Sequence, residues 1–198
     1  MGLNLQYEYG QTELEQEEVE DLKISSISTK FELDEFEQQN IEEAMLWIMN
    51  KKWKVEKIFS EAFIKEVHAR MYSNVWKWAG KFRKTEKNIG VAHYKISLDL
   101  KHLLDDAIFW IKQQSYPADE IAIRFKHRLV SIHCFANGNG RHSRIMADII
   151  VEKLFGLKPF TWGKNSTENN AETRDTYIKA VKTADNYDIA PLIKFARS

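Results

Sequence analysis

The sequence predicts an all-α domain with one short β element. Its 198 residues are enough for a single domain. Hydrophobic residues make up 43% of the chain and aromatic residues 12%, which provides a sizeable core and excludes a disordered protein. Three prolines and eight glycines occur, while long stretches are rich in the helix-favouring residues Glu, Lys, Leu, Ile and Ala.

Apolar residues that recur every three or four positions place the helices in order. The expected helices span residues 15–22, 34–51, 60–73, 97–114, 117–132, 141–156, 172–184 and 191–198. Asp34 and Ser60 are the expected caps of the second and third. The fifth opens at Pro117, and Gly156 ends the sixth. The apolar face of the second helix is expected to consist of Phe36, Ile41, Ala44 and Ile48.

Residues 75–96 break the helical pattern. Glycines at positions 80 and 90 bracket strand-like pieces in this stretch. We therefore expect a short β-hairpin or an extended flap here.

Charge is distributed unevenly along a chain whose net charge is zero. Residues 1–43 contain thirteen acids against Lys23 and Lys30, a net charge of −11, so residues 44–198 carry +11. One interpretation is a solvated acidic surface. The other is a basic cleft for an anion, with the acidic segment close to it. The zero balance argues against direct nucleic-acid binding.

The cellular setting is predicted from what the sequence lacks. Cys134 is the single cysteine, so an intramolecular disulfide is excluded. The N-terminal residues do not follow the pattern of a signal peptide. No apolar run approaches the ~18 residues that cross a membrane. We expect a cytoplasmic protein without membrane contact.

The stretch HCFANGNGRHSR, residues 133–144, carries the chemistry. Gly138 and Gly140 free the backbone and leave room for a ligand. Because the loop runs directly into a helix, its N–H groups predict an anion site. Arg141 and Arg144 share one face of the first turn and suit phosphate oxygens.

The other side chains of the stretch complete this interpretation. His133 is the candidate general base. Phe135 is expected to anchor the loop in the core, and the Asn139 amide to donate to a phosphate oxygen. Each feature alone is more often structural, but together they serve one reaction. We do not expect Cys134 to be a nucleophile, and the histidine spacing predicts no structural zinc.

The stretch resembles the Fic signature, H-x-F-x-[DE]-G-N-G-R-x-x-R. WAGKFR at 78–83 and the C-terminal YIKAVKTADNYDIAPLIKFARS are also similar to that family, and the closest resemblance is to the group called mobile mystery protein B. The resemblance implies a Fic-type helical bundle with a β-hairpin flap over residues 34–198. Residues 1–33 would then be an acidic N-terminal segment, with regulation as one role to test.

The resemblance also implies an activity, the transfer of AMP from ATP to a Ser, Thr or Tyr hydroxyl of a target protein. His133 would be the base, and the target would lie along the flap near Ile89, Gly90 and Val91. Tyr177 would belong to the adenine pocket. The residues implied for holding the phosphates are Gly138, Asn139, Gly140, Arg141 and Arg144.

Asn137 departs from the family pattern, because it replaces the acid that binds Mg²⁺. An amide oxygen can ligate Mg²⁺ without contributing charge. Two alternatives to AMP transfer therefore stay open, transfer of another nucleotide or phosphate group and a weakened nucleotide- or partner-binding module. Inhibition could come from Glu20, from Glu32 or from a small antitoxin-like partner. The sequence does not decide between a monomer and an oligomer.

Overall fold

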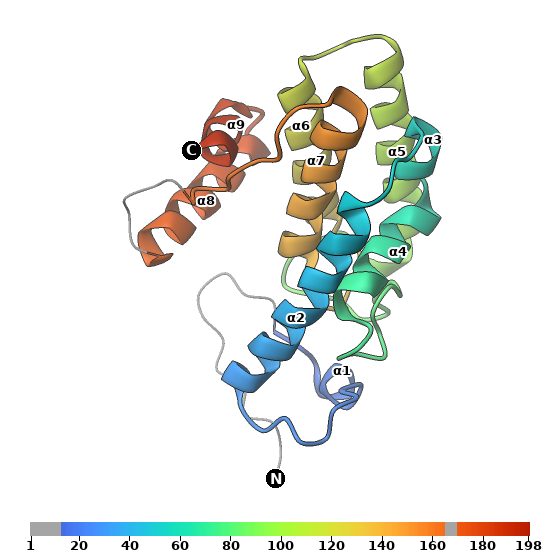
Figure 1. Cartoon of the computed structure of the whole chain (residues 1–198), viewed down its shortest axis with the longest axis vertical. Helices are drawn as coiled ribbons and strands as arrows, with labels where there is room; N and C mark the ends of the chain where they lie inside the picture. Colours follow the sequence, from blue (N-terminus) through green and yellow to red (C-terminus); the bar gives the residue numbers. More distant parts are fainter. Residues whose placement is uncertain (1–12, 165–169) are drawn as a thin grey trace.

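The computed structural model describes residues 13–164 and 170–198, and it confirms the helical fold (Figure 1). The described part contains no extended strand; Leu22 and Trp76 form one isolated antiparallel bridge, and Phe82 and Phe135 form another. The helices are α1 (Gln16–Val19), α2 (Lys30–Met49), α3 (Val55–Ile58), α4 (Glu61–Tyr72), the 3-10 helix η1 (His93–Lys95), α5 (Ile96–Lys112), α6 (Ala118–Ile132), α7 (Asn139–Phe155), α8 (Asn170–Asp185) and α9 (Ala190–Arg197).

The core lies between α2, α4, α5, α6 and α7. Helix α6 packs against α5 and α7, and α4 packs against α2 and α7. Helices α8 and α9 pack on each other beside this bundle (Figure 1). Fully buried side chains from four helices fill the centre, among them Phe63, Leu100, Phe125 and Met146. The connection between α6 and α7, which carries the glycine-rich stretch, therefore emerges from the best-packed part of the molecule.

Helix α2 differs from the prediction at its start and in its buried face. It begins at Lys30, and the capping residue is Thr29 rather than Asp34. The Thr29 hydroxyl accepts the N–H of Glu32 while the Glu32 carboxylate accepts the N–H of Thr29, and this capping box satisfies two free donors at once. Phe36 is 41% exposed, whereas Glu37 beside it is buried. The Glu37 carboxylate contacts Arg141 and Trp76, which accounts for this exchange.

The predicted β-hairpin over residues 75–96 is wrong. Phe82 pairs with Phe135, and the N–H of Val91 donates to the carbonyl of Ile132 at 3.3 Å. The backbone bonds within the segment close only local turns, and its long-range backbone bonds reach residues 21–23, the end of α6 and the loop after it. We keep the name flap for residues 85–91, which lie against that loop.

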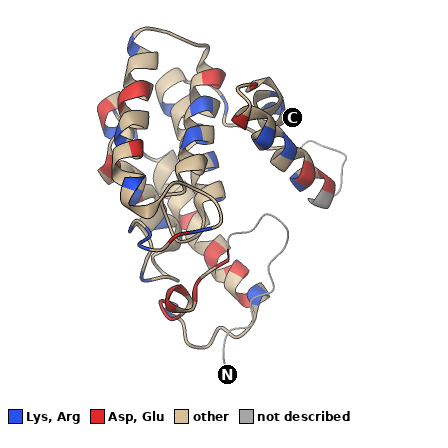
Figure 2. Cartoon of the chain, turned by 180° about the vertical axis from the view of Figure 1, so that it is seen from behind, with Lys and Arg blue, Asp and Glu red and all other residues tan. Residues whose placement is uncertain are grey.

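The N-terminal residues that the structure describes lie against the flap side of the bundle. The Trp78 indole donates to the Glu18 carbonyl at 3.2 Å, and Leu22 bridges Trp76. Acidic residues gather on α1 and the neighbouring part of α2 (Figure 2). Within residues 13–164 and 170–198, no helix is both long and apolar enough to cross a membrane.

Candidate active site

The loop between α6 and α7 has the predicted form of an anion site. Helix α6 ends at Ile132, and His133 follows in the left-handed conformation with φ 58°. Gly138 has φ 77° and caps α7, which begins at Asn139. The free N–H groups at this helix start meet the positive end of the helix dipole. An anion is therefore favoured directly after the loop.

Gly138 and Gly140 differ in the space around them. A Cβ on Gly138 would lie 2.5 Å from the Tyr72 ring, so both the backbone conformation and the packing require glycine there. A Cβ on Gly140 would meet no atom within 4 Å. Gly140 thus borders open space at the start of α7, where an anion can approach the backbone.

Asn139 has a structural task that the sequence interpretation missed. Its side-chain oxygen accepts the N–H of Phe135 at 2.9 Å, and its nitrogen donates to the Phe135 carbonyl at 2.8 Å. The residue is 4% exposed. The expected donation from this amide to a phosphate is therefore not what the structure shows. A nucleotide contact of Asn139 remains a prediction for its backbone.

Phe135 anchors the loop, as expected, through a cluster of rings. It is fully buried and stacks on His68 with centroids 3.7 Å apart. The His68 Nδ1 accepts the N–H of Gly80 at 3.0 Å, so its Nε2 carries the proton that it donates to the Asn137 carbonyl at 3.0 Å. Burial holds the pKa of His68 well below its usual range. This neutral histidine joins α4, the turn at Gly80 and the loop.

His133, the predicted base, is buried and has a lowered pKa. It is 3% exposed, and burial lowers its pKa to about 4, helped by the nearby charges of Arg83 and Lys87 and opposed by a hydrogen bond with the Val130 backbone. The imidazole is therefore neutral at pH 7. A neutral imidazole can accept a proton, as general base catalysis requires.

Arg141 has an acidic partner that the sequence interpretation missed. Its Nη2 lies 2.7 Å from a carboxylate oxygen of Glu37, and the other oxygen accepts the Trp76 indole N–H at 2.7 Å. The Glu37 side chain is 6% exposed and the Arg141 side chain 37% exposed. The first predicted phosphate ligand is thus partly neutralised by α2, which explains why Glu37 is buried in place of Phe36.

Arg144 lies over Tyr177, with its guanidinium carbon 5.5 Å from the ring centroid. The Tyr177 hydroxyl accepts a hydrogen bond from Lys126 at 2.6 Å, and Lys126 is fully buried. None of the ion pairs in the described part of the chain involves Arg144, so neither Glu20 nor Glu32 pairs with it. Glu32 is instead engaged in the capping box of α2. Arg144 and Tyr177, the residue predicted to belong to the adenine pocket, are therefore neighbours.

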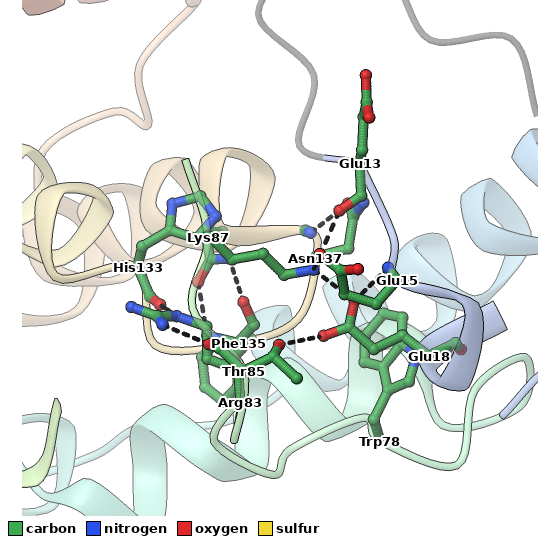
Figure 3. A network of polar contacts seen from close by, with 12 residues as sticks. Glu13, Glu15, Glu18, Trp78, Arg83, Thr85, Lys87, His133, Phe135 and Asn137 are labelled. Carbon is green, nitrogen blue, oxygen red and sulfur yellow. Dashed lines mark hydrogen bonds and ion pairs between the residues drawn. The ribbon is translucent and has the colours of Figure 1, made fainter. Parts of the chain in front are cut away.

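The acidic N-terminal segment contacts the flap beside this loop (Figure 3). A carboxylate oxygen of Glu18 lies 2.5 Å from Lys87 Nζ, and the other accepts the Thr85 hydroxyl at 3.0 Å. The Lys87 side chain is 2% exposed. One cation of the flap is thus already paired with the acidic segment.

The three residues predicted to bind a target differ in whether their backbone groups are already hydrogen-bonded. Ile89 is 50% exposed, and among the described residues no backbone hydrogen bond uses Ile89 or Gly90. Val91 donates its N–H to Ile132 and accepts a hydrogen bond from Arg83. Pairing with an extended peptide can therefore involve Ile89 and Gly90, whereas the Val91 backbone is occupied.

A bound cation would find few protein ligands here. No group of three His, Cys, Asp or Glu side chains that could hold a metal occurs in the described ranges. The Asn137 side-chain oxygen accepts the N–H of Gly138 at 2.5 Å. Since Mg²⁺ prefers carboxylate and phosphate oxygens, most of its ligands would have to come from a nucleotide.

Known proteins resemble this chain in sequence and in fold. A model of the Fic/DOC family matches residues 58–151. The protein adenylyltransferase Fic of Drosophila grimshawi is 28% identical over 137 residues, which is 67% of this chain and 26% of that protein. The N-terminal FIC domain of Bep8, a VirB-translocated effector from Bartonella sp. 1-1C, aligns with a TM-score of 0.69 at 16% identity, covering 90% of each chain.

A second solved structure contains a nucleotide. BepC of Bartonella tribocorum with bound AMPPNP aligns with a TM-score of 0.66 at 15% identity, covering 92% of this chain and 97% of that one. The fold and site thus define a helical domain whose glycine-rich loop leads into the start of a helix. The chain belongs to the Fic (Fido) family. It spans about a quarter of the length of the adenylyltransferases that it matches.

Proposed function

We propose that this chain is a nucleotidyltransferase that moves AMP from ATP to a Ser, Thr or Tyr hydroxyl of a target protein. The observation that carries the proposal is a buried, neutral His133 at one end of a loop whose other end opens on the start of α7. A proton acceptor and an anion site next to each other are what nucleotidyl transfer to a hydroxyl requires. The family relationship supports the same reaction.

The reaction assigns each group one task. His133 accepts the proton of the target hydroxyl, whose oxygen forms a bond to the α-phosphorus of ATP. The bond from that phosphorus to the bridging oxygen breaks, and pyrophosphate leaves. The backbone of Gly138, Asn139 and Gly140 holds phosphate oxygens, and Arg141 and Arg144 hold the β- and γ-phosphates. Tyr177 lies beside Arg144 and is proposed to border the adenine.

Mg²⁺ belongs to the proposal as a companion of the nucleotide. It would offset phosphate charge when bound. Asn137 would be its protein ligand, through one neutral oxygen that also accepts the N–H of Gly138. Metal affinity should therefore depend on the triphosphate more than on the protein.

The second candidate is a nucleotide- or partner-binding module with little turnover. Two observations favour it, the amide at position 137 and the pairing of Arg141 with Glu37. Transfer of another nucleotide or phosphate group is the related alternative within enzymes. A module would bind ATP without converting it to pyrophosphate or ADP, so consumption of ATP separates it from both reactions.

Two protein partners are proposed. The target would lie along Ile89 and Gly90, where backbone groups are available for strand-like pairing. The second is a small antitoxin-like protein that inserts an acid at Arg144, which has no ion-pair partner in the described part of the chain. The proposed location of the protein in the cell is the cytoplasm.

The test is a comparison of ATP labelled at the α- or the γ-phosphate, incubated with the full chain, Mg²⁺ and a lysate as source of targets. AMP transfer predicts that the α-label, and not the γ-label, becomes bound to protein. Incorporation of the γ-label would favour phosphate transfer. ATP binding with neither label incorporated would favour the binding module.

A further inference from the structure

We infer that Arg83 is a positioning residue that holds the base loop and both ends of the flap in one arrangement. The inference rests on the proposed function, because it concerns how the base meets the target. The structure carries it through three hydrogen bonds from one buried side chain to three separate segments of backbone.

All three nitrogens of the Arg83 guanidinium donate hydrogen bonds to backbone carbonyl groups. Its Nε donates to the His133 carbonyl at 2.7 Å, its Nη1 to the Thr85 carbonyl at 2.7 Å, and its Nη2 to the Val91 carbonyl. The side chain is 0% exposed. Thr85 and Val91 are the two ends of the flap, so the same group closes the flap and attaches it to the base.

The backbone around Arg83 reinforces this attachment. The N–H of Arg83 donates to the Cys134 carbonyl at 2.9 Å. A Cβ on Gly90 would lie 2.5 Å from the His133 Cβ and 3.0 Å from a terminal nitrogen of Arg83. The flap therefore lies in direct contact with the base, with no room for a side chain between them.

The position of the His133 carbonyl explains why a charged donor is needed. His133 follows the last residue of α6 in a left-handed conformation, which is uncommon for a residue with a side chain. Its carbonyl lies at a helix end, where acceptors lack partners within the helix. A hydrogen bond from a cation is stronger than one from a neutral donor. Arg83 thus satisfies this carbonyl and stabilises the conformation that presents the imidazole.

The fixed fork of arginine matters for this task. Five N–H donors in one plane can serve three carbonyls at once, whereas a lysine presents one compact charge. Glu86 is the acid that faces the guanidinium, 3.8 Å away and with its side chain 59% exposed. Buried carbonyls, more than an ion pair, therefore determine where Arg83 lies. Small misplacements of reacting groups cost large factors in rate, so the base and a flap-bound target depend on this one residue.

The test uses the full chain with Arg83→Lys and, as control, Arg128→Lys, since Arg128 is exposed on α6. We expect Arg83→Lys to accelerate hydrogen exchange in residues 85–91 and 133–135, while exchange elsewhere and the ATP dissociation constant stay within about threefold of wild type. Transfer to protein should fall by roughly 100-fold in kcat. Methylguanidinium should restore part of the activity of Arg83→Ala.

The possible outcomes are separable. Unchanged exchange in both segments would overturn the inference, and so would transfer at the wild-type rate. If ATP binding and transfer fell by the same factor, Arg83 would have a general structural role and would not be a positioning residue. If the wild type transfers no nucleotide, the proposed function fails, and the exchange pattern still decides whether Arg83 ties the flap to the loop.

Discussion

Replacing Glu37 by Gln should increase the affinity of the chain for ATP. The carboxylate of Glu37 holds Nη2 of Arg141 at 2.7 Å, in competition with any phosphate that needs this guanidinium. Glutamine keeps an oxygen that can accept the Trp76 indole N–H, which now bonds to Glu37 at 2.7 Å. The substitution therefore removes the charge and leaves the packing of α2 nearly unchanged.

The size of the effect follows from the exposure of the ion pair. A hydrogen bond between charged groups contributes roughly 1.5–3 kcal/mol. Because the Arg141 side chain is 37% exposed, solvent screening reduces this to about 1–2 kcal/mol. ATP binding to Arg141 must overcome that free energy. Its removal should tighten the ATP dissociation constant by about 5–30-fold.

Isothermal titration calorimetry with ATP and Mg²⁺ measures this change. Glu43→Gln on the same helix is the matched control, since the Glu43 carboxylate contacts Asn74 and forms no ion pair with an arginine of α7. Its ATP affinity should equal that of the wild type. An unchanged or weaker affinity in Glu37→Gln would show that the carboxylate orients Arg141 for phosphate and does not compete with it.

Three further predictions address the loop. Gly140→Ala should raise the unfolding free energy by about 0.5–1 kcal/mol, because alanine favours the helix. The added methyl group fills the open space at the start of α7, so the same substitution should weaken ATP binding. ATP binding as tight as in the wild type would show that the phosphates lie elsewhere. Asn137→Asp should increase Mg²⁺-dependent transfer, since a carboxylate adds charge, and equal metal dependence in both forms would exclude Asn137 as the ligand. His133, with a folded pKa of about 4, binds fewer protons than in the unfolded chain. Its stabilising contribution is therefore complete above about pH 6.5 and is lost as pH falls through 4. Wild type should lose more unfolding free energy than His133→Gln between pH 7.5 and 4.5, and parallel losses would contradict the lowered pKa.

Local patterns predicted most of the helices and the form of the anion loop. Apolar spacing identified α4, α5 and α6, and the glycines after His133 identified the start of α7. The signals for these features lie within a few residues of one another. Thr29 and Glu32 form the capping box that begins α2. The sequence interpretation selected Asp34 because several acceptable caps occur close together.

Contacts between distant residues could not be predicted in this way. Glu37 meets Arg141 across 104 positions, and His68 meets Asn137 across 69. Neither residue has a local pattern that distinguishes it from a solvated glutamate or a core histidine. The hairpin prediction was wrong for the same reason, since Phe82 pairs with Phe135, which is distant in sequence.

The most direct test of the central claim is transfer of α-labelled AMP by the wild type and by His133→Ala. His133 is buried beside the flap and neutral at pH 7, so it should be the proton acceptor while the anion site binds ATP without it. We predict that His133→Ala loses transfer by at least about 100-fold and binds ATP as tightly as the wild type. Equal transfer by the two forms would contradict the assignment of His133 as the base.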